Sequence, residues 1–554
     1  MKKFTLSLLS LAVLSGSIYT KAIYAKNSAS DIYTDTNVAQ LSKNEAALLK
    51  KHQGEFTRPT YQTAVVEYRD AWNKIGSNKI PEWIIDAKFG IYTHWGVYSV
   101  PAFATNVYHR YMYDKSNPRG IYQYHLDNFG KPEDFGYSKF VDMFKAEDYN
   151  AKNMLDLMID SGAKFGGLGL VHHDGFLMWD SKISRWNAGN MGPKRDLYGE
   201  FVTEARKRDF KVAASFHHAR TWDMVYKDLD ESSFNATEKS KLDIYDPAYE
   251  DFFPGRHSKT TTIDVFAQQW HDKIIEVVDK YSPDFFFFDG IRRTNANSPE
   301  NLVVDALDYY YEHAKAEGKE VVVANKLPGG ANFNFPEHVG IPTYEGGRDM
   351  PADVGGYFLV DRAISYPWTY VNNKDYNLKA NYHIDALMDM VARGGIYLLS
   401  LTPMASGAID PKEEAIFREI GQWLNINGEA IYDTRRWTIP AEGPISTWKI
   451  KESGKKKQVM RMIWTYNNVK DGEIRFTQKD GQLYAMSLTW PKSGELLIES
   501  LKANSEYYPQ GINKVSMLGY GDVEFTRTKA GLKIKLPKQK PSKIFSHGMS
   551  FKIH

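Results

Sequence analysis

The sequence contains no cysteine among its 554 residues. This absence excludes disulfide bonds, catalytic thiols, thiolate metal ligands and lipid attachment to a cysteine. Strong net charge is also missing, because 70 basic residues stand against 68 acidic ones and leave +2. Neither nucleic acid nor an acidic membrane surface is therefore favoured as a partner. The glycines of residues 162–169 lack the spacing of a phosphate-binding loop, so nucleotide binding is not indicated either.

Apolar runs long enough to span a membrane are lacking as well, and the apolar run at the N-terminus is short. Lys2 and Lys3 precede an apolar stretch from about Phe4 to Val13, which is the layout of a secretory signal peptide. The stretch is too short to span a membrane. We therefore expect residues 1–25 to be a signal peptide, residues 26–60 to be a lead-in segment, and the protein to be periplasmic or secreted.

The region from residue 61 to 432 consists of short apolar runs that alternate with helix-like segments. The runs lack polar alternation, which is typical of strands buried on both faces. Segments such as 199–209 and 267–281 carry apolar residues at helical spacing and are expected to be helices. Seven runs end at or near polar residues, namely His94, His172, His217, Asp289, Lys326, Glu345 and Ser400. Alternating strands and helices predict a parallel sheet.

The distribution of these polar ends distinguishes two kinds of parallel sheet. A barrel collects site residues from the carboxyl ends of many strands, whereas a doubly wound sheet binds its ligand at one switch point. At least five strands contribute here, and residues 363–371 offer a possible eighth strand. We therefore predict an α/β fold with a (β/α)8-like barrel as the catalytic domain.

Residues 433–554 have a different pattern, with alternating apolar and polar positions punctuated by turns. The segment Lys479-Asp480-Gly481 lies between two such stretches and predicts a β-hairpin. A chain of this length needs at least two domains. We expect this second domain to be an antiparallel β-sandwich, and it contains no cluster of catalytic residue types.

Two carboxylates are the leading candidates for catalysis. Asp289 follows four phenylalanines that must be buried, and a buried Asp is costly unless it is paired or functional. Glu345 ends another apolar run and is followed by two glycines, although a surface ion pair with Arg348 would explain it equally well. Glycoside hydrolysis requires such a pair of carboxyl groups. Glu337, Asp349 and Asp361 are reserves for the second position.

Histidines form the third feature of the candidate site. His94, His172, His173 and either His217 or His218 follow predicted strands. Adjacent side chains of a strand point to opposite faces, so His172 and His173 can both face inward only if the strand ends there. A metal site is conceivable, but hydrogen bonds to sugar hydroxyls account for the cluster equally well. We expect no metal and no cofactor.

Aromatic residues make up 14% of the chain, which suits either an aromatic-rich core or the stacking of sugar rings. Five segments in order also resemble the family 29 glycoside hydrolases, the retaining α-L-fucosidases. These segments are "WIIDAKFGIYTHWGVYSVPAF", "KFGGLGLVHHDGFLMWDSKISRWN", "GPKRDLYGEF", "PDFFFFDG" and "ARGGIYLLSLTP". The tail resembles the C-terminal β-sandwich of that family, notably in "GEIRFTQKDGQLYAMSLTWP" and "GLKIKLP".

The resemblance implies roles for individual residues. Asp289 takes the place of the family nucleophile, and Glu345 is the best match for the acid/base. Residues expected to contact α-L-fucose are His94, His172, His173 and Tyr113, to which we add Trp95 and His217. The resemblance predicts a retaining exo-α-L-fucosidase that removes terminal fucose from fucosylated glycans by double displacement.

Two alternatives remain at this stage. A family "WE" segment is represented here by Trp368-Thr369, which has no carboxylate, so the chain could be a fucose-binding barrel without catalysis. A related sugar such as α-L-galactose, which has one more hydroxyl on C6, could also be the substrate. Arginine side chains suit sulfated glycans, and candidates for that contact are Arg292, Arg293 and Arg348, although solvated surface arginines are the simpler explanation. The sequence does not indicate an oligomeric state.

Overall fold

The computed structural model describes most of the chain beyond the N-terminal segment. The described residues are 68–291, 299–326, 334–347, 350, 354–444, 448–449, 459–460, 466 and 469–554. The predicted signal peptide and lead-in segment lie outside them, as do Arg292, Arg293, Arg348 and Asp349. Within the described residues, no helix combines the length and apolar character needed to cross a membrane.

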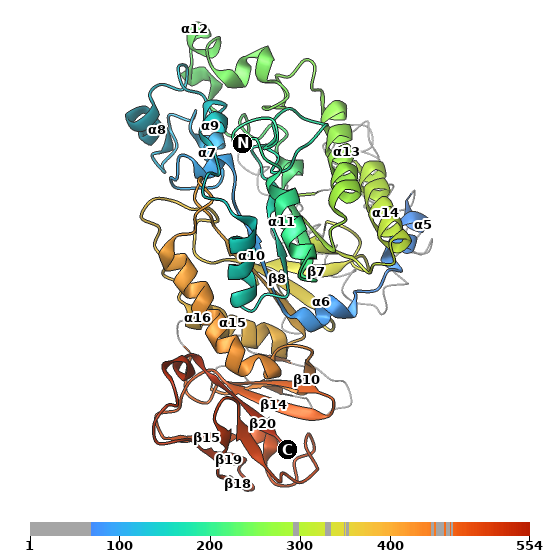
Figure 1. The fold of residues 1–554 in the computed structure, drawn as a ribbon, viewed down its shortest axis with the longest axis vertical. Helices are drawn as coiled ribbons and strands as arrows, with labels where there is room; N and C mark the ends of the chain where they lie inside the picture. Colours follow the sequence, from blue (N-terminus) through green and yellow to red (C-terminus); the bar gives the residue numbers. More distant parts are fainter. Residues whose placement is uncertain are drawn as a thin grey trace, which may run out of the picture.

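A closed parallel barrel forms the larger domain (Figure 1). Its strands are β1 (Phe89–Thr93), β2 (Phe165–Gly167), β3 (Gly169–Val171), β4 (Lys211–Phe216), β5 (Phe285–Phe288), β6 (Val322–Lys326), β7 (Ile341–Glu345), β8 (Phe358–Ala363) and β9 (Gly395–Leu401). They pair in the order β2-β1-β9-β8-β7-β6-β5-β4-β3, and a pairing of β2 with β4 closes the ring. β2 and β3 are two parts of one strand position, separated at Leu168. The predicted barrel is confirmed.

The eighth strand lies earlier in the chain than the sequence pattern placed it. The prediction was residues 363–371, whereas β8 spans Phe358–Ala363. Asp361 and Arg362 interrupt the apolar character of β8, which hid it from a search for continuous apolar runs. Pro367 lies in the predicted segment, and proline cannot donate a hydrogen bond to a neighbouring strand.

Helices cover the outside of the barrel on most of its circumference. They are α10 (Ala151–Asp160), α11 (Leu197–Arg206), α13 (Ile263–Tyr281), α14 (Glu300–Ala316), α15 (Ala380–Ala392) and α16 (Pro411–Asn427), while α6 (Glu82–Ala87) lies at one end of the barrel. α11 and α13 confirm the two helices expected from apolar spacing. The Thr262 side chain accepts a hydrogen bond from the Val265 N–H and so caps α13. The described residues between β6 and β8 form no helix, so the barrel departs from eight full repeats there.

Shorter helices extend the barrel at the end away from the C-terminal sheets (Figure 1). They are α7 (Tyr108–Tyr111), α8 (Ile121–Phe129), α9 (Lys139–Met143) and α12 (Ala236–Lys239), while α5 (Arg69–Gly76) packs beside α14. At the opposite end, Ile84 and Ile85 of α6 pack into the same apolar cluster as Phe285 and Phe287 of β5. Gly167 of β2 is needed for strand pairing, because a Cβ there would lie 1.8 Å from the Ala213 carbonyl oxygen.

Antiparallel sheets form the C-terminal domain. The larger sheet contains β10 (Arg435–Glu442), β13 (Ile474–Lys479), β14 (Gln482–Ser487), β20 (Met549–Ile553), β16 (Val515–Met517) and β17 (Gly521–Asp522). The others contain β15 (Glu495–Ile498), β19 (Leu532–Lys535) and β18 (Phe525–Arg527), and the pair β11 (Trp448–Lys449) and β12 (Val459–Met460). The predicted hairpin joins β13 to β14, with φ of 49° at Asp480 and 77° at Gly481. Positive φ at both turn residues is typical of a tight hairpin turn.

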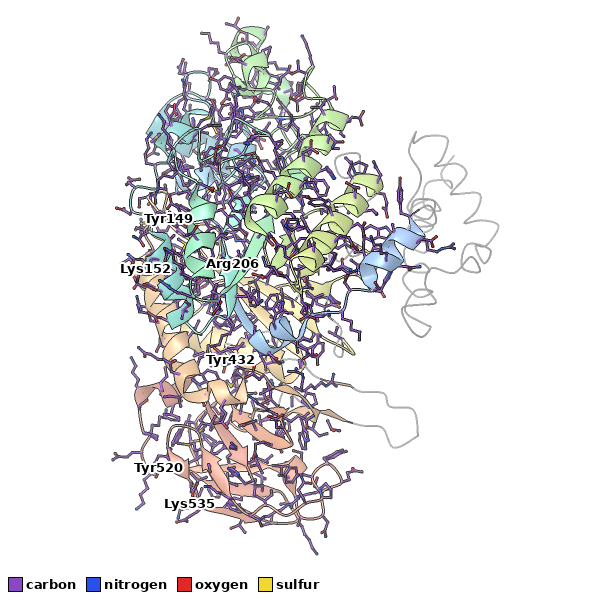
Figure 2. All side chains as sticks on the ribbon, turned by 45° about the vertical axis from the view of Figure 1, so that its right-hand side comes forward. Tyr149, Lys152, Arg206, Tyr432, Tyr520 and Lys535 are labelled. Atoms are coloured by element: carbon purple, nitrogen blue, oxygen red, sulfur yellow. The ribbon has the colours of Figure 1, made fainter. Side chains whose placement is uncertain are left out.

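Buried polar contacts join the two domains. Arg475 of β13 donates from Nε to Asp389 Oδ1 of α15 at 2.5 Å, and both side chains are buried. Tyr432, labelled at the junction in Figure 2, lies just before β10 and is held to the barrel, because its hydroxyl donates to the Gly162 carbonyl at 2.6 Å. α15 is buried along nearly its whole length, because it contacts β9 of the barrel as well as β10 and β13. The barrel is therefore packed against the C-terminal sheets, at the end away from its shorter helices.

Candidate active site

The carboxyl ends of the barrel strands surround a cavity of about 170 Å³. Its lining residues are Tyr92, His94, Asn106, His172, His173, His217, Arg220, Asp289, Lys326, Glu345, Asp361 and Trp368. Pockets for drug-sized ligands are larger, at about 300–1,000 Å³. The size and the polar lining therefore suit a single sugar ring. Carboxyl ends of barrel strands are also where enzymes of this fold hold their active sites.

Asp289 lies directly after β5 and is 5% exposed. The backbone at this point is fixed, because the Asp289 N–H donates to the Phe216 carbonyl at 3.0 Å. Gly290 has φ of 78° and allows the Arg220 side chain to approach closely, since a Cβ there would lie 2.4 Å from Arg220 Nε. Arg220 Nη1 is in turn 3.8 Å from Asp289 Oδ2.

Electrostatics favour the ionised form of Asp289. Burial alone would raise the pKa of this carboxyl group, but neighbouring Lys326 and Arg220, with His217 and His173, outweigh burial and hold the pKa well below its usual range. Lys326 Nζ is only 2.8 Å from Asp289 Oδ1. A buried carboxylate kept ionised at the mouth of a strand is suited to nucleophilic attack.

Glu345 is the last residue of β7, and its side chain is 32% exposed. Gly346 and Gly347 follow with φ of 61° and 73°, which confirms the unusual backbone expected after it. Its Oε2 is 3.1 Å from Lys326 Nζ, which also contacts Asp289. Because Asp289 Oδ1 and Glu345 Oε2 both contact Lys326 Nζ, the distance between these oxygens cannot exceed the sum of the two contact distances, about 5.9 Å. The structure thus brings the two predicted carboxylates together.

All four predicted histidines line the cavity. His94 follows β1, His172 and His173 follow β3, and His217 follows β4. His172 and His173 both face the cavity because β3 ends at Val171, before the doublet. His218 points elsewhere, and its Nε2 is 2.8 Å from Lys273 Nζ.

Hydrogen bonds orient the histidine rings. His94 Nδ1 hydrogen-bonds with Ser400 Oγ at 2.8 Å, and His217 Nδ1 with Ser215 Oγ at 3.2 Å. His173 Nδ1 donates to the His217 carbonyl at 2.9 Å, which leaves its Nε2 facing Asp289. The rings are therefore held in fixed positions that leave the second nitrogen of each available to a ligand.

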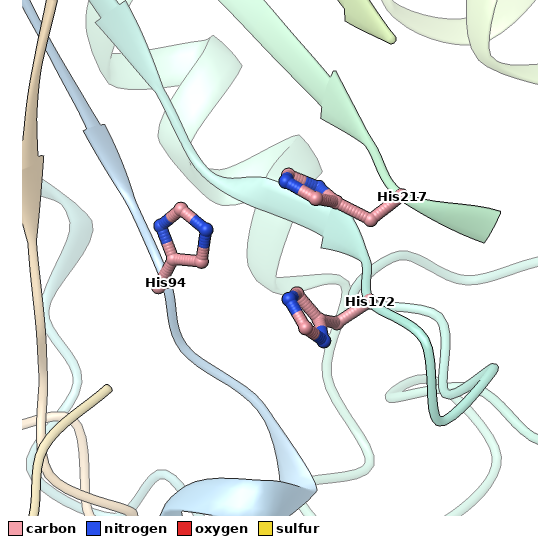
Figure 3. Close-up of side chains that lie close together, drawn as sticks. All are labelled: His94, His172 and His217. Atoms are coloured by element: carbon pink, nitrogen blue, oxygen red, sulfur yellow. The ribbon is translucent and has the colours of Figure 1, made fainter. Parts of the chain in front are cut away.

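The histidines are neutral in the folded protein. Burial lowers the pKa of His94 to about 3 and that of His173 to about 4, and it holds the pKa of His172 and His217 well below the usual value. Figure 3 shows His94, His172 and His217 with their rings around a shared space, and one ligand atom from each lies within 4.8 Å of the others. In the described part of the chain, no other group of three His, Cys, Asp or Glu residues has the spacing to hold a metal ion. Neutral imidazoles bind sugar hydroxyls equally well.

The contribution of these histidines to stability is expected to fall when the pH is lowered from 6.5 to about 4. In the unfolded chain these histidines take up protons below pH 6.5, whereas folded His173, with a pKa of about 4, does not. Each such histidine lowers the free energy of unfolding by up to about 1.4 kcal/mol per pH unit in this window. Buried carboxyl groups with a raised pKa, such as Asp174 and Asp361 at about 6, act in the opposite direction, so the contribution of one histidine is measured by comparing the wild type with a variant that lacks it.

Urea unfolding measured at several pH values tests this expectation. The slope of unfolding free energy against pH should be shallower in His94→Asn than in the wild type. The difference should correspond to the uptake of nearly one proton on unfolding. Identical slopes in the two proteins would contradict a neutral, buried His94.

Two predicted sugar contacts lie outside the cavity. Trp95 donates its indole N–H to the Met404 carbonyl at 2.7 Å, and its ring packs against Phe144 and Tyr149. Tyr113 is fully buried, and its hydroxyl donates to Asp243 Oδ1 at 2.6 Å. Both side chains point into the packing around the barrel, and the structure does not bring them to the site.

Six lining residues were not predicted as site residues, although Asp361 was a reserve: Tyr92, Asn106, Arg220, Lys326, Asp361 and Trp368. The sequence could have indicated Lys326 as a site residue, because it ends the apolar strand β6 just as other site residues end or follow their strands. Trp368 lies with its ring centroid 4.9 Å from that of His94 and offers an aromatic face to a sugar. Asn106 and Arg220 lie outside the strands, where the sequence pattern gives no signal.

The comparisons with known proteins agree with this geometry. The family model described as "Alpha-L-fucosidase" matches residues 56–429, and the model of the α-L-fucosidase C-terminal domain matches residues 466–554. Human tissue α-L-fucosidase is 27% identical over 492 residues, which cover 86% of this chain and 89% of the relative. Plasma α-L-fucosidase of Pongo abelii is 26% identical over 490 residues, covering 86% and 90%.

Solved structures share the fold. The α-fucosidase of Thermotoga maritima in complex with fucose has a TM-score of 0.63 and 23% identity, covering 87% of this chain and 99% of that one. A trapped covalent intermediate of an α-L-fucosidase from Bacteroides thetaiotaomicron has a TM-score of 0.58 and 18% identity, covering 86% and 97%. Because the family model spans more than half of the chain, this protein belongs to the α-L-fucosidase family of glycoside hydrolases.

Proposed function

We propose that this chain is a retaining exo-α-L-fucosidase in which Asp289 is the nucleophile and Glu345 is the acid/base. Its substrates are fucosylated oligosaccharides or polysaccharides, from which it removes terminal α-L-fucose. The cavity supports exo action, because its volume of about 170 Å³ suits one sugar ring rather than a longer chain. Its neutral histidines and Trp368 supply the hydrogen bonds and the aromatic face that a sugar requires.

The single observation that carries the mechanism is the shared contact of the two carboxylates. Asp289 Oδ1 and Glu345 Oε2 both touch Lys326 Nζ, so these oxygens lie no more than about 5.9 Å apart. Retaining glycosidases hold their carboxyl groups about 5–5.5 Å apart, and inverting ones about 6.5–9.5 Å apart to admit a water molecule. The spacing therefore supports retention.

In the first step, the Asp289 carboxylate attacks the anomeric carbon of fucose. The bond from that carbon to the glycosidic oxygen breaks, and protonated Glu345 gives its proton to the departing oxygen. A covalent fucosyl-enzyme results. In the second step, Glu345, now a carboxylate, takes a proton from water, whose oxygen attacks the anomeric carbon and releases Asp289. Two inversions give net retention.

The alternative of a binding protein without catalysis rested on the missing carboxylate at Thr369. Thr369 is fully buried near Ser99 and does not line the cavity, so a carboxylate there is not required. Glu345 supplies one from β7 instead. Whether the substrate is α-L-galactose instead depends on the space near C6 of the sugar. The rates of cleavage of an aryl α-L-fucoside and an aryl α-L-galactoside decide between the two sugars.

Hydrolysis of an aryl α-L-fucoside followed by proton NMR tests the proposal. The first product formed should be α-L-fucose, which then equilibrates with the β anomer. Initial formation of β-L-fucose would contradict retention, and binding of fucose without turnover would establish the binding protein. Faster cleavage of an aryl α-L-galactoside would reassign the sugar.

We also propose that sulfated fucosylated glycans are accepted. Arg220 supports this, because it lines the cavity and its side chain is 42% exposed, and a guanidinium group suits a sulfate. Matched sulfated and desulfated oligosaccharides should show a lower KM for the sulfated form, and Arg220→Met should remove the difference. An equal KM for the sulfated and desulfated oligosaccharides would reject the proposal that sulfate is recognised.

For localisation, we propose the periplasm or the extracellular medium, on the basis of the N-terminal sequence alone. Cell fractionation followed by N-terminal sequencing should find a mature chain that begins near residue 26. An intact N-terminus in the cytoplasmic fraction would contradict it.

A further inference from the structure

Lys326 stands at the centre of three carboxyl groups. Its Nζ lies 2.8 Å from Asp289 Oδ1, 3.1 Å from Glu345 Oε2 and 3.6 Å from Asp361 Oδ2. The side chain is only 6% exposed, and as the last residue of β6 it is flanked by β5 and β7, which present two of these groups. Burial alone would lower the pKa of Lys326, but Asp289 and the other two carboxyls outweigh it, so the ammonium is charged.

The proposed double displacement moves negative charge between two of these groups. Before the first step, Asp289 is ionised and Glu345 is protonated. Once the anomeric carbon is bonded to Asp289 and the proton has left with the aglycone, Asp289 is a neutral ester and Glu345 is a carboxylate. The second step reverses both changes. The total charge of the pair stays constant while its position alternates.

We propose that Lys326 is a positioning residue whose ammonium follows this charge, pairing with Asp289 in the free enzyme and with Glu345 in the fucosyl-enzyme. This inference rests on the proposed function. One nitrogen within 3.1 Å of both groups can exchange partners without moving its backbone. A preorganised charge aimed at both positions stabilises each ionised state.

Asp361 supplies the counter-charge that holds the ammonium in place. It lies on β8 beside Glu345 in the β7–β8 register and is 1% exposed. Its Oδ1 is buried and has no hydrogen-bond partner among the described residues, and its Oδ2 is 3.4 Å from the Tyr92 hydroxyl. Burial raises its pKa to about 6. At neutral pH, Asp361 therefore opposes the charge of Lys326 without taking part in bond formation.

Other groups around the nucleophile are not placed to do the same. Three other basic side chains face Asp289. Arg220 Nη1 and His173 Nε2 are 3.8 Å and 3.7 Å from Asp289 Oδ2, and His217 also faces this carboxylate. The histidines are neutral, and Arg220 lies within ion-pair distance of Asp289 but not of Glu345. Lys326 is the cation recorded in contact with both carboxylates within the described residues.

The decisive experiment compares pH–rate profiles of the wild type and Lys326→Met on an aryl α-L-fucoside. An ammonium lowers the pKa of a neighbouring carboxyl, so its removal raises the pKa of Asp289. The acidic limb of kcat/KM, which requires ionised Asp289, should move up by about 1 to 3 pH units. kcat should fall roughly a hundredfold at neutral pH, the scale of one lost preorganised contact. The Kd for L-fucose should change less than kcat.

Three further variants separate positioning from structure. Lys326→Arg keeps the charge and should restore the acidic limb towards that of the wild type. Asp361→Asn should leave the acidic limb in place, because Asp361, with a pKa of about 6, is already protonated at the pH where Asp289 titrates. Lys273→Met is the matched control, because Lys273 is also a buried barrel lysine but contacts His218 instead of a carboxylate. It should lower thermal stability and leave the limb unchanged.

The outcomes distinguish this inference from the proposed function. If wild-type protein does not cleave the fucoside, the proposed function fails. If it does, and Lys326→Met folds with an unmoved acidic limb, the inference is overturned. A loss confined to KM and fucose affinity would overturn it too, since it would make Lys326 a sugar contact only. If Lys326→Met does not fold, Lys326→Gln takes its place, and an unmoved acidic limb in that variant has the same consequence.

Discussion

Asp289→Gly is expected to lower kcat on an aryl α-L-fucoside by about 10⁴-fold or more, a loss on the scale of removing a nucleophile. The variant lacks the group that forms the covalent intermediate, and no other carboxylate recorded in the cavity replaces it at the same position. Glu345 is engaged in proton transfer, and Asp361 lies behind Lys326 with 1% exposure. Steady-state kinetics against purified wild type, with folding checked by thermal unfolding, measure the effect.

Azide gives the loss a stereochemical readout. The space left in Asp289→Gly admits azide on the face from which Asp289 attacks, so the rescued product should be β-L-fucosyl azide with inverted configuration. Recovery of activity with a retained product would place the nucleophile elsewhere. Wild-type rates without azide would reject the assignment outright.

Asp284 provides a matched control for this variant. It is buried at the opposite end of β5, where its Oδ2 is 2.5 Å from Arg206 Nη1 and accepts from the Val212 N–H at 2.7 Å. Residues at this end of a barrel contribute to stability and not to chemistry. Asp284→Asn should therefore lower the unfolding temperature and leave kcat of the folded protein unchanged. The same strand would then carry a structural aspartate at one end and a reactive one at the other.

The predicted site residues that line the cavity share one property. Asp289, Glu345 and the four histidines each end, or directly follow, an apolar strand, and burial of that strand fixes where the next side chain points. A parallel barrel brings all such ends to one mouth. The continuous apolar runs therefore placed these residues at the cavity without knowledge of any contact between them.

The residues that were missed or misplaced depend on contacts that periodicity does not encode. Trp95 directly follows the cavity residue His94, yet it turns away into the packing around β1. Tyr113 is directed by its bond to Asp243, which is 130 residues later in the sequence. Asp361 interrupts β8 instead of ending it, so a polar residue that belongs to the site looked like the absence of a strand. Such positions are set by tertiary packing alone.

Glu345→Gly is expected to show a loss that depends on the leaving group. Without the acid, departure of a sugar hydroxyl loses proton donation, which contributes about 10²–10⁴-fold. An aryl leaving group as acidic as dinitrophenol needs little protonation, so its first step should be nearly unaffected. Its turnover is then limited by the second step, which lacks the base. Kinetics on dinitrophenyl α-L-fucoside and on a fucosylated oligosaccharide should differ accordingly, with a burst of dinitrophenol on the former.

Azide distinguishes this variant from Asp289→Gly by product configuration. In Glu345→Gly, azide attacks the fucosyl-enzyme from the face that water normally uses, so the product should be α-L-fucosyl azide with retained configuration. Glu337→Gln is the matched control, because Glu337 is an exposed carboxylate shortly before β7 and does not line the cavity. It should match the wild type on both substrates. Equal losses on both substrates in Glu345→Gly, without a burst, would move the acid/base role away from β7 and leave only the nucleophile assigned.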